Sequence, residues 1–287
     1  MTVLEVIQRS TEFLTQKGVD SPRLQTELLL AHVLKQPRMQ LYLNFERVLS
    51  PVELDALRSL VKRRSQREPL QHIVGSTSFC GLEVAVTPAV LVPRPETELL
   101  AELGWSFLQQ LSASNQGPIC AADIGTGSGC IAIALAVKCP SVQVYAVDIS
   151  NQALEITRQN ARDHGVIARL ECVQGDRLTA LPPGTRFDLI VSNPPYIPTA
   201  EIETLDPEVR NHDPRQALDG GLDGLDFYRY FAAQAGPWLK PRGKLMLEFG
   251  DDQAQPIGQI FEEQKWIVER VAEDYTQRPR ILIVKQI

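Results

Sequence analysis

Cysteine and histidine are too sparse and too scattered in this sequence to suggest a metal centre or a disulfide framework. The 287 residues contain five cysteines and four histidines, with no CxxC pair. The cysteines are odd in number, widely spaced, and mostly set inside apolar runs. A zinc site is therefore not expected, and the pattern favours a reducing compartment. We predict a cytoplasmic protein without bound metal.

Long apolar runs are absent as well. The longest, residues 130–137, is far shorter than the roughly 20 residues that a membrane-spanning helix needs. Near the start, Glu5, Gln8 and Arg9 stand where a signal peptide would have its apolar segment. We therefore expect no membrane association.

Positive charge is not in excess either. The chain has 29 basic and 35 acidic residues, which gives a net charge of −6. This balance argues against a protein that mainly coats nucleic acid, although a local basic patch remains compatible with it. With 44% hydrophobic and 22% charged residues, the composition is that of a globular protein.

Residues 1–70 have apolar side chains at helical spacing, which predicts a small helical domain. Ser21-Pro22 suits a helix start, with Ser as the cap. Ser50-Pro51-Val52-Glu53 is a stronger start, because it has the form of a capping box. The basic run that follows, 62–67, either complements the end of that helix or forms a docking surface for an anionic partner.

Residues 71–95 have a different pattern. Alternating residues around Gly81 predict a β-hairpin that links the two larger regions. Residues 91–98 lead into a helix that extends to about Leu111, and 115–118 form a loop.

From residue 96 to 287 strands and helices alternate. Strands are expected at 119–124, 142–148, 168–173, 187–192, 243–249, 266–272 and 280–286, and helices at 128–138, 151–164, 225–236 and 253–264. Such alternation predicts a mostly parallel, doubly wound α/β sheet of Rossmann-like form. The last two strands lack an intervening helix, so one of them is expected to run antiparallel. Ligands of such sheets bind where the carboxyl ends of the strands meet.

The first expected strand ends in a glycine-rich loop, Gly125-Thr126-Gly127-Ser128-Gly129. Glycines between a strand and a helix let a ligand approach the backbone at the helix N-terminus. A dinucleotide fingerprint would have GxGxxG spacing. The GxGxG spacing found here instead resembles the first motif of class I S-adenosylmethionine-dependent methyltransferases.

Three acids accompany this loop. Asp148, at the end of the second strand, can accept both hydrogen bonds of a ribose diol. Asp176 follows the third strand and is placed to meet an adenine amino group, with Arg177 beside it. Asp123 either holds the loop or contacts the amino group of the cofactor. Together these signals predict an S-adenosylmethionine site, with S-adenosylhomocysteine as the product.

The fourth strand ends in Asn193-Pro194-Pro195-Tyr196, which matches the (N/D)PP(Y/F/W) motif of methyltransferases that modify planar nitrogens. The lone pair of such a nitrogen is delocalised, so it is a weak nucleophile. The Asn193 side-chain oxygen and the Pro194 carbonyl would accept its two N–H bonds and direct the lone pair at the methyl group. Prolines stiffen the turn because φ is fixed, and Tyr196 offers a face for a flat group. We expect Asn193 to border the cofactor too.

Over nearly its whole length the chain resembles the release factor glutamine methyltransferases. The resemblance depends on the turn at 193–196 and on EPLQHIVG at 68–75, LVPRPETE at 91–98 and ALDGGLDGLDFY at 217–228. It implies methylation of the side-chain amide (N5) of the glutamine in the GGQ loop of peptide chain release factors. It also implies that residues 1–70 recognise the substrate, 71–95 link, and 96–287 form the methyltransferase domain.

Two positions depart from the family pattern. Arg177 stands where an aromatic residue often packs near the adenine, and Cys80 stands where the hairpin often has an aromatic. Roles also stay open for Arg94 and Glu96, which either start a helix with an ion pair or contact substrate. The segment 219–226 is either a simple turn before a helix or part of the site.

Two other functions compete with this interpretation. A DNA adenine or RNA guanine methyltransferase would use the same Asn-Pro-Pro-Tyr turn, but it must extrude the base and usually adds a basic domain. A non-catalytic binding module would lack the glycines or Asn193, which are all present. No stable nucleic-acid partner is therefore expected.

Overall fold

The computed structural model describes residues 1–114 and 117–287 and divides them into two compact units. The helical unit comprises residues 1–76 and 206–212, and the sheet unit comprises 77–205 and 213–287. The loop predicted at 115–118 falls partly outside the described residues, at 115–116. No helix in the described part of the chain is long and apolar enough to cross a membrane.

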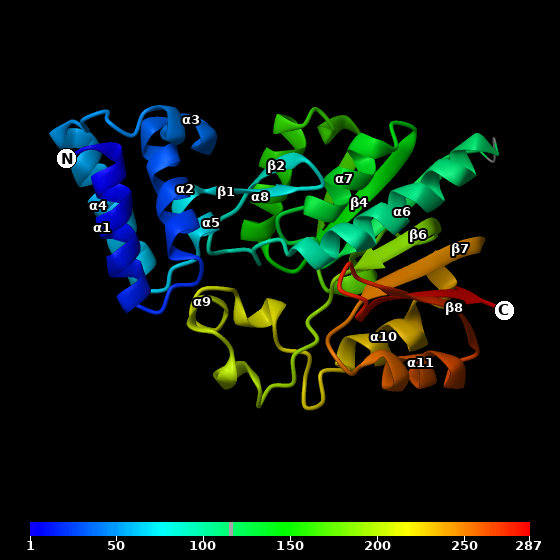
Figure 1. Cartoon of the computed structure of the whole chain (residues 1–287). Coiled ribbons are helices and arrows are strands. Elements are labelled where there is room, and N and C mark those ends of the chain that lie inside the picture. Colours follow the sequence, from blue (N-terminus) through cyan, green and yellow to red (C-terminus); the bar gives the residue numbers. More distant parts are fainter. Residues whose placement is uncertain (115–116) are drawn as a thin grey trace. The chain divides into compact units, whose positions relative to one another are not determined.

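The helical unit is built of short helices, and those within residues 1–76 share one apolar core (Figure 1). Its helices are α1 (Val3–Gln16), α2 (Pro22–Leu34), α3 (Arg38–Leu43), α4 (Pro51–Ser65), α5 (Leu70–Val74) and α9 (Pro207–Arg210). The predicted capping box is confirmed at α4, where Ser50 and Glu53 each bond the backbone of the other. The predicted cap of α2 is wrong. That helix begins at Pro22, but Ser21 has a φ of 45° and its side chain makes no cap bond within the described residues.

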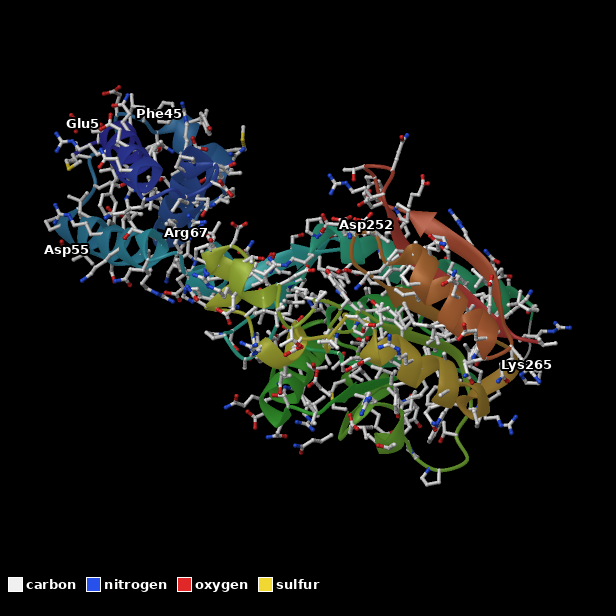
Figure 2. All side chains as sticks on the ribbon, turned by 90° about the horizontal axis from the view of Figure 1, so that it is seen from below. Glu5, Phe45, Asp55, Arg67, Asp252 and Lys265 are labelled. Carbon is white, nitrogen blue, oxygen red and sulfur yellow. The ribbon has the colours of Figure 1, made fainter. Side chains whose placement is uncertain are left out.

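The basic run at the end of α4 forms ion pairs inside this unit. Arg64 is buried and its Nη2 lies 2.6 Å from Glu208 Oε1, an oxygen that Arg67 Nε also contacts at 2.6 Å. Glu208 belongs to α9, 144 residues after Arg64. Arg67, which follows α4, is labelled in Figure 2. The two arginines therefore hold α9 in the helical unit. This role differs from both that the sequence suggested for the run, which were to complement the helix end or to dock an anionic partner.

The predicted hairpin is confirmed as β1 (Ser76–Phe79) and β2 (Leu82–Ala85). Its two turn residues, Cys80 and Gly81, have φ values of 52° and 76°. A two-residue turn with both φ values positive is of the tight hairpin type, which matches the twist of the strands. Cys80 therefore occupies the first position of a tight turn. Its backbone N–H donates to Glu98 Oε1 at 2.8 Å.

The predicted doubly wound sheet is confirmed. Its strands are β3 (Ile119–Ile124), β4 (Val142–Asp148), β5 (Leu170–Gln174), β6 (Phe187–Ser192), β7 (Leu239–Glu248), β8 (Trp266–Glu273) and β9 (Pro279–Gln286), in the order β5-β4-β3-β6-β7-β9-β8. The first five in this order pair in parallel. β9 is antiparallel to both of its neighbours, as expected.

Helices cover both faces of this sheet (Figure 1). On one face lie α6 (Pro95–Ala113), α7 (Cys130–Lys138) and α8 (Asn151–Asp163); on the other lie α10 (Asp226–Gln234) and α11 (Ala254–Glu263). Short 3-10 turns occupy Ile167–Arg169, Arg177–Ala180, Ile202–Thr204, Arg215–Ala217 and Gly236–Trp238. Chain connections diverge between β3 and β6, so a crevice forms at their carboxyl ends.

Candidate active site

A cavity of about 260 Å³ lies at the carboxyl ends of the parallel strands. Four strand ends supply the residues that sequence analysis singled out, and the hairpin exit, the 214–217 turn and α10 supply the rest. The lining residues are Ala89, Val90, Leu91, Ile124, Gly125, Gly127, Val147, Asp148, Ile149, Ala153, Gly175, Asp176, Arg177, Asn193, Pro195, Pro214, Gln216, Ala217 and Phe227.

Side chains of α8 hydrogen-bond to main-chain carbonyls of the glycine-rich loop. Thr157 Oγ1 donates to the Gly127 carbonyl at 2.9 Å, and Asn160 Nδ2 donates to the Ser128 carbonyl at 2.9 Å. Gly129 has a φ of 81°, and a Cβ there would lie 2.7 Å from Thr157 Cγ2. Glycine is therefore required at 129 by both conformation and space.

Asp123 holds the loop, which is one of the two roles that the sequence left open. It is fully buried, and its Oδ2 accepts from Thr126 Oγ1 at 2.6 Å and from the Ala132 N–H at 3.2 Å. Burial raises the pKa of Asp123 to about 7, against the lowering effect of these hydrogen bonds. Thr126 and Ser128 are also buried, so the loop rests on a polar interior.

Asp148 projects from the end of β4 to the cavity. Its Oδ2 accepts from the Gly127 N–H at 2.9 Å and its Oδ1 from the Ser150 N–H at 2.9 Å. A carboxylate has about four lone-pair sites, so acceptor capacity remains for a ligand hydroxyl. The two backbone bonds fix the direction in which the carboxylate points.

Asp176 and Arg177 form a bidentate pair at the end of β5, with both N···O distances 2.8 Å. This hydrogen bonding holds the pKa of Asp176 below its usual range. Arg177 has a φ of 49°, and its guanidinium carbon lies 4.0 Å from the Tyr230 ring centroid and 5.5 Å from that of Phe227. Phe227 itself lines the cavity. Position 177 has no aromatic side chain in this protein, and Phe227 of α10 supplies an aromatic ring to the cavity wall instead.

The Asn193–Tyr196 turn separates this cavity from a second one. Asn193 Nδ2 donates to Thr97 Oγ1 at 3.1 Å, and the Tyr196 carbonyl accepts from Gln253 Nε2 at 2.9 Å. Pro194 is buried and Pro195 is partly exposed. Burial raises the pKa of Tyr196 to about 12, so its ring is a neutral phenol at neutral pH.

The glycine-rich segment 219–226 packs on the backbone of this turn. The Ile197 N–H donates to the Leu218 carbonyl at 3.0 Å, and the Gly220 N–H donates to the Ile197 carbonyl at 2.9 Å. Gly224 has a φ of 75°, and a Cβ there would overlap the Tyr196 carbonyl oxygen. The segment is therefore more than a turn before α10, because its backbone packs against the backbone at the end of the Asn193–Tyr196 turn.

The second cavity, of about 410 Å³, lies beyond Tyr196 and has a strongly charged lining. Arg94 Nη2 pairs with Asp213 Oδ2 at 2.6 Å, which fits the helix-start and ion-pair interpretation of that residue. Arg280 pairs with Asp251 at 2.8 Å. Glu248, at the end of β7, is buried against the same cavity.

The predicted cofactor residues divide into two groups. Gly125, Gly127, Asp148, Asp176, Arg177 and Asn193 line the first cavity, whereas Thr126, Ser128 and Gly129 do not. Their contacts with a cofactor stay a prediction. Sequence reasoning missed Thr97, Thr157, Asn160 and Glu248. Of these only Thr97 was signalled, since it lies within the motif at 91–98.

Comparison with known proteins agrees with both units. Residues 5–75 match the model of the PrmC N-terminal domain, and residues 105–206 match that of the methyltransferase small domain. Among solved structures, a methyltransferase from Pyrococcus furiosus is similar over 79% of this chain and 99% of its own, at 20% identity and a TM-score of 0.52. The catalytic domain of human Mettl16, solved with an RNA hairpin, is similar over 72% of this chain and 76% of its own, at 14% identity and a TM-score of 0.53. These two likenesses concern the fold.

Full-length relatives are more specific. The release factor glutamine methyltransferase of Geobacter sulfurreducens is 48% identical over 91% of this chain and 88% of its own length. That of Chlorobaculum tepidum is 41% identical over 97% of this chain and 95% of its own. With both family models, the cavity and the Asn193–Tyr196 turn in agreement, the chain belongs to the release factor glutamine methyltransferase family.

Proposed function

We propose that this protein transfers a methyl group from S-adenosylmethionine to the side-chain amide nitrogen, N5, of the glutamine in the GGQ loop of peptide chain release factors. The observation that carries the proposal is the place of the Asn193–Tyr196 turn, which borders the glycine-loop cavity on one side and a second cavity on the other. Family membership over nearly the whole chain supports the same substrate.

The residues of the first cavity fit S-adenosylmethionine. Gly125 and Gly127 have no side chain, so a ligand in the cavity can approach their main chain closely. Asp148 presents a carboxylate suited to a ribose diol. Val90, Leu91 and Phe227 give an apolar wall for a flat base. When bound, the cofactor supplies an electrophilic methyl group on a sulfonium, and it leaves as S-adenosylhomocysteine.

The protein itself orients the nitrogen. An amide nitrogen is a weak nucleophile because its lone pair is delocalised into the carbonyl. The Asn193 side-chain oxygen and the Pro194 carbonyl accept its two N–H bonds, which draws the lone pair out of conjugation and toward the methyl group. Neither Pro194 nor Pro195 has an N–H that would compete for these acceptors. Tyr196 gives the planar amide a neutral ring face. Orientation of this kind supplies much of a rate enhancement when no strong base is present.

The helical unit has a role in this proposal as well. Residues 1–70 engage the release factor, and the sheet unit carries out the transfer. A nucleic-acid substrate is not favoured, because the net charge is −6 and the full-length relatives are named for release factors.

The test combines product mapping with two variants. The purified protein is incubated with S-adenosylmethionine and a release factor, and the added methyl is located by peptide mass spectrometry. Asn193→Ala should reduce transfer by at least about 100-fold, because it removes an acceptor of the substrate N–H. Cofactor affinity should stay within severalfold, because Asp148 and the glycine-rich loop still line the cavity. Asp148→Ala should instead weaken cofactor binding by about tenfold or more, since it removes two charge-assisted hydrogen bonds.

Calorimetric titration of S-adenosylhomocysteine measures that affinity for both variants. Methylation of DNA or RNA but not of the GGQ glutamine would contradict the substrate. Undiminished transfer by the Asn193 variant would contradict the role of the turn.

A further inference from the structure

The Asn193 carboxamide has two ends with opposite hydrogen-bonding character. Its oxygen can accept an N–H from a substrate amide, whereas its NH₂ group can only donate. A half-turn about the terminal torsion exchanges the two ends with almost no change of shape. Transfer requires the oxygen to face the substrate, so the partners of the carboxamide must define its orientation.

Thr97 is the partner of the NH₂ group. Asn193 Nδ2 donates to Thr97 Oγ1 at 3.1 Å, and Thr97 is only 2% exposed, in the first turn of α6. A hydroxyl donates once and accepts twice. Thr97 alone would therefore accept the NH₂ end or donate to the oxygen end, and it does not distinguish the two orientations.

Glu248 removes that ambiguity. Leu247 pairs with Ser192 across β6 and β7, so the next residues of both strands, Glu248 and Asn193, are neighbours. Glu248 is 2% exposed, and its buried Oε2 has no hydrogen-bond partner among the described residues. This oxygen can take the Thr97 proton, and the Thr97 and Asn193 side chains both act to lower the pKa of the Glu248 carboxyl group. A carboxylate only accepts. Once the Thr97 hydroxyl has donated its single proton to Glu248, it has only lone pairs left for Asn193.

We propose that Glu248 and Thr97 are positioning residues, which hold the NH₂ end of the Asn193 carboxamide and so direct its oxygen at the substrate nitrogen. The proposal deepens the proposed function, because it takes amide-nitrogen transfer at Asn193 as its basis. Neither residue touches the reacting atoms. Their effect is exerted through the orientation of one side chain.

The protonation state of Glu248 controls this arrangement. A protonated carboxyl donates to Thr97, and the Thr97 proton is then released to bond the Asn193 oxygen. The preferred orientation is thereby lost. Burial raises the pKa of Glu248 to about 7, and the bond from Thr97 opposes this rise. The orientation should accordingly be enforced above that pKa and weakened below it.

Other charged and titratable groups also face Glu248. Glu96 of α6 raises its pKa further, and Arg280 of β9 lowers it. Tyr196 lies close enough for the Glu248 charge to raise the pKa of the phenol. Tyr228 of α10 donates its hydroxyl to the main-chain carbonyl of Glu248 at 2.8 Å, which leaves the carboxyl group untouched.

Four variants test the proposal. Thr97→Val keeps the shape but cannot bond, and kcat should fall by about 100-fold, as expected for a misaligned catalytic group. Thr97→Ser keeps the hydroxyl and should restore kcat to within about threefold of the wild type. Glu248→Gln tests the charge. Tyr228→Phe is the matched control, since it removes a buried hydroxyl that bonds only the main-chain carbonyl of Glu248 and not its carboxyl group. Affinity for S-adenosylhomocysteine should be unchanged in all four.

The pH profile is the readout that a merely structural role would not move. In the wild type kcat should rise with pH through about 7, as Glu248 loses its proton. Glu248→Gln should flatten that rise, and Tyr228→Phe should keep it. Full kcat in Thr97→Val, or an unchanged rise in Glu248→Gln, would overturn the proposal.

An NMR measurement keeps this test separate from that of the proposed function. The side-chain NH₂ signals of Asn193 are identified by their loss in Asn193→Asp. They should shift with pH through about 7 in the wild type and stay constant in Glu248→Gln. Absence of any pH-dependent shift would refute the control by Glu248, whatever the substrate is. A wild-type protein that shows this shift but does not methylate a release factor would refute the proposed function instead.

Discussion

Replacing Gly224 by alanine tests whether the segment 219–226 holds the Asn193–Tyr196 turn in place. The φ of Gly224 is 75°, and an alanine Cβ would overlap the Tyr196 carbonyl oxygen and lie 3.1 Å from its carbonyl carbon. Carbon and oxygen atoms in neighbouring chains usually stay at least about 3.3 Å apart. Relief of the overlap therefore requires the two backbones to separate by on the order of 1 Å.

Two effects should follow, and they differ in size. The left-handed conformation costs alanine about 1–2 kcal/mol, which should lower the apparent unfolding temperature by a few degrees. Displacement of the turn should have a larger effect, because misplacement of a catalytic group by about 1 Å can reduce the rate 100-fold. The cofactor affinity should stay within about threefold of the wild type, because Gly224 does not line the glycine-loop cavity.

Gly221→Ala is the matched control. Gly221 has a φ of 90°, but its Cβ would meet the side chain of Asp226, which is exposed and able to move. This variant should lose similar stability and keep most of its kcat. The assay is single-turnover methylation of a release factor, with thermal unfolding and titration of S-adenosylhomocysteine on the same samples. Equal kcat in the two variants would refute the idea that Gly224 determines the geometry of the turn.

Two further predictions concern stability. Asp123 keeps its proton in the folded state up to about pH 7 but loses it near pH 4 when unfolded, so stability should fall as pH rises between these values, by up to about 4 kcal/mol from this group. Asp123→Asn should reduce that slope in urea titrations at several pH values, leaving a remainder from Glu248, and an unchanged slope would contradict the assignment. Glu208→Gln should cost about 3 kcal/mol, because Arg64 would stay buried without its carboxylate partner. A loss below about 0.5 kcal/mol in urea unfolding would show that the pair does not secure α9.

The sequence by itself determined the strands of the central sheet, the helices between most of them, and where the candidate cavity lies. The strand bounds predicted from apolar runs agree with β3, β4 and β6 at both ends, because a buried parallel strand has to be apolar throughout. The capping box at Ser50 was predictable for a similar reason, since all of its hydrogen bonds are local. Parallel strands bring their carboxyl ends to one edge, so residues just after each strand were expected to meet. Gly125, Asp148, Asp176 and Asn193 do line one cavity.

Only the tertiary structure decided which side chains support those residues. Thr97 contacts Asn193 from 96 positions earlier in the chain, and Glu208 pairs with Arg64 from 144 positions later. No local pattern encodes such a pair, because its geometry follows from how helices pack on a sheet or on one another. The same holds for Phe227, which supplies the aromatic wall that Arg177 does not.

Burial explains the remaining difference between sequence and structure. Asp123 and Glu248 look like ordinary acids in the sequence, yet desolvation raises the pKa of each to about 7. The extent of burial is known only when every neighbouring element is in place. The sequence thus determined residues that line the candidate cavity, and packing determined the orientation and charge of the groups that hold them.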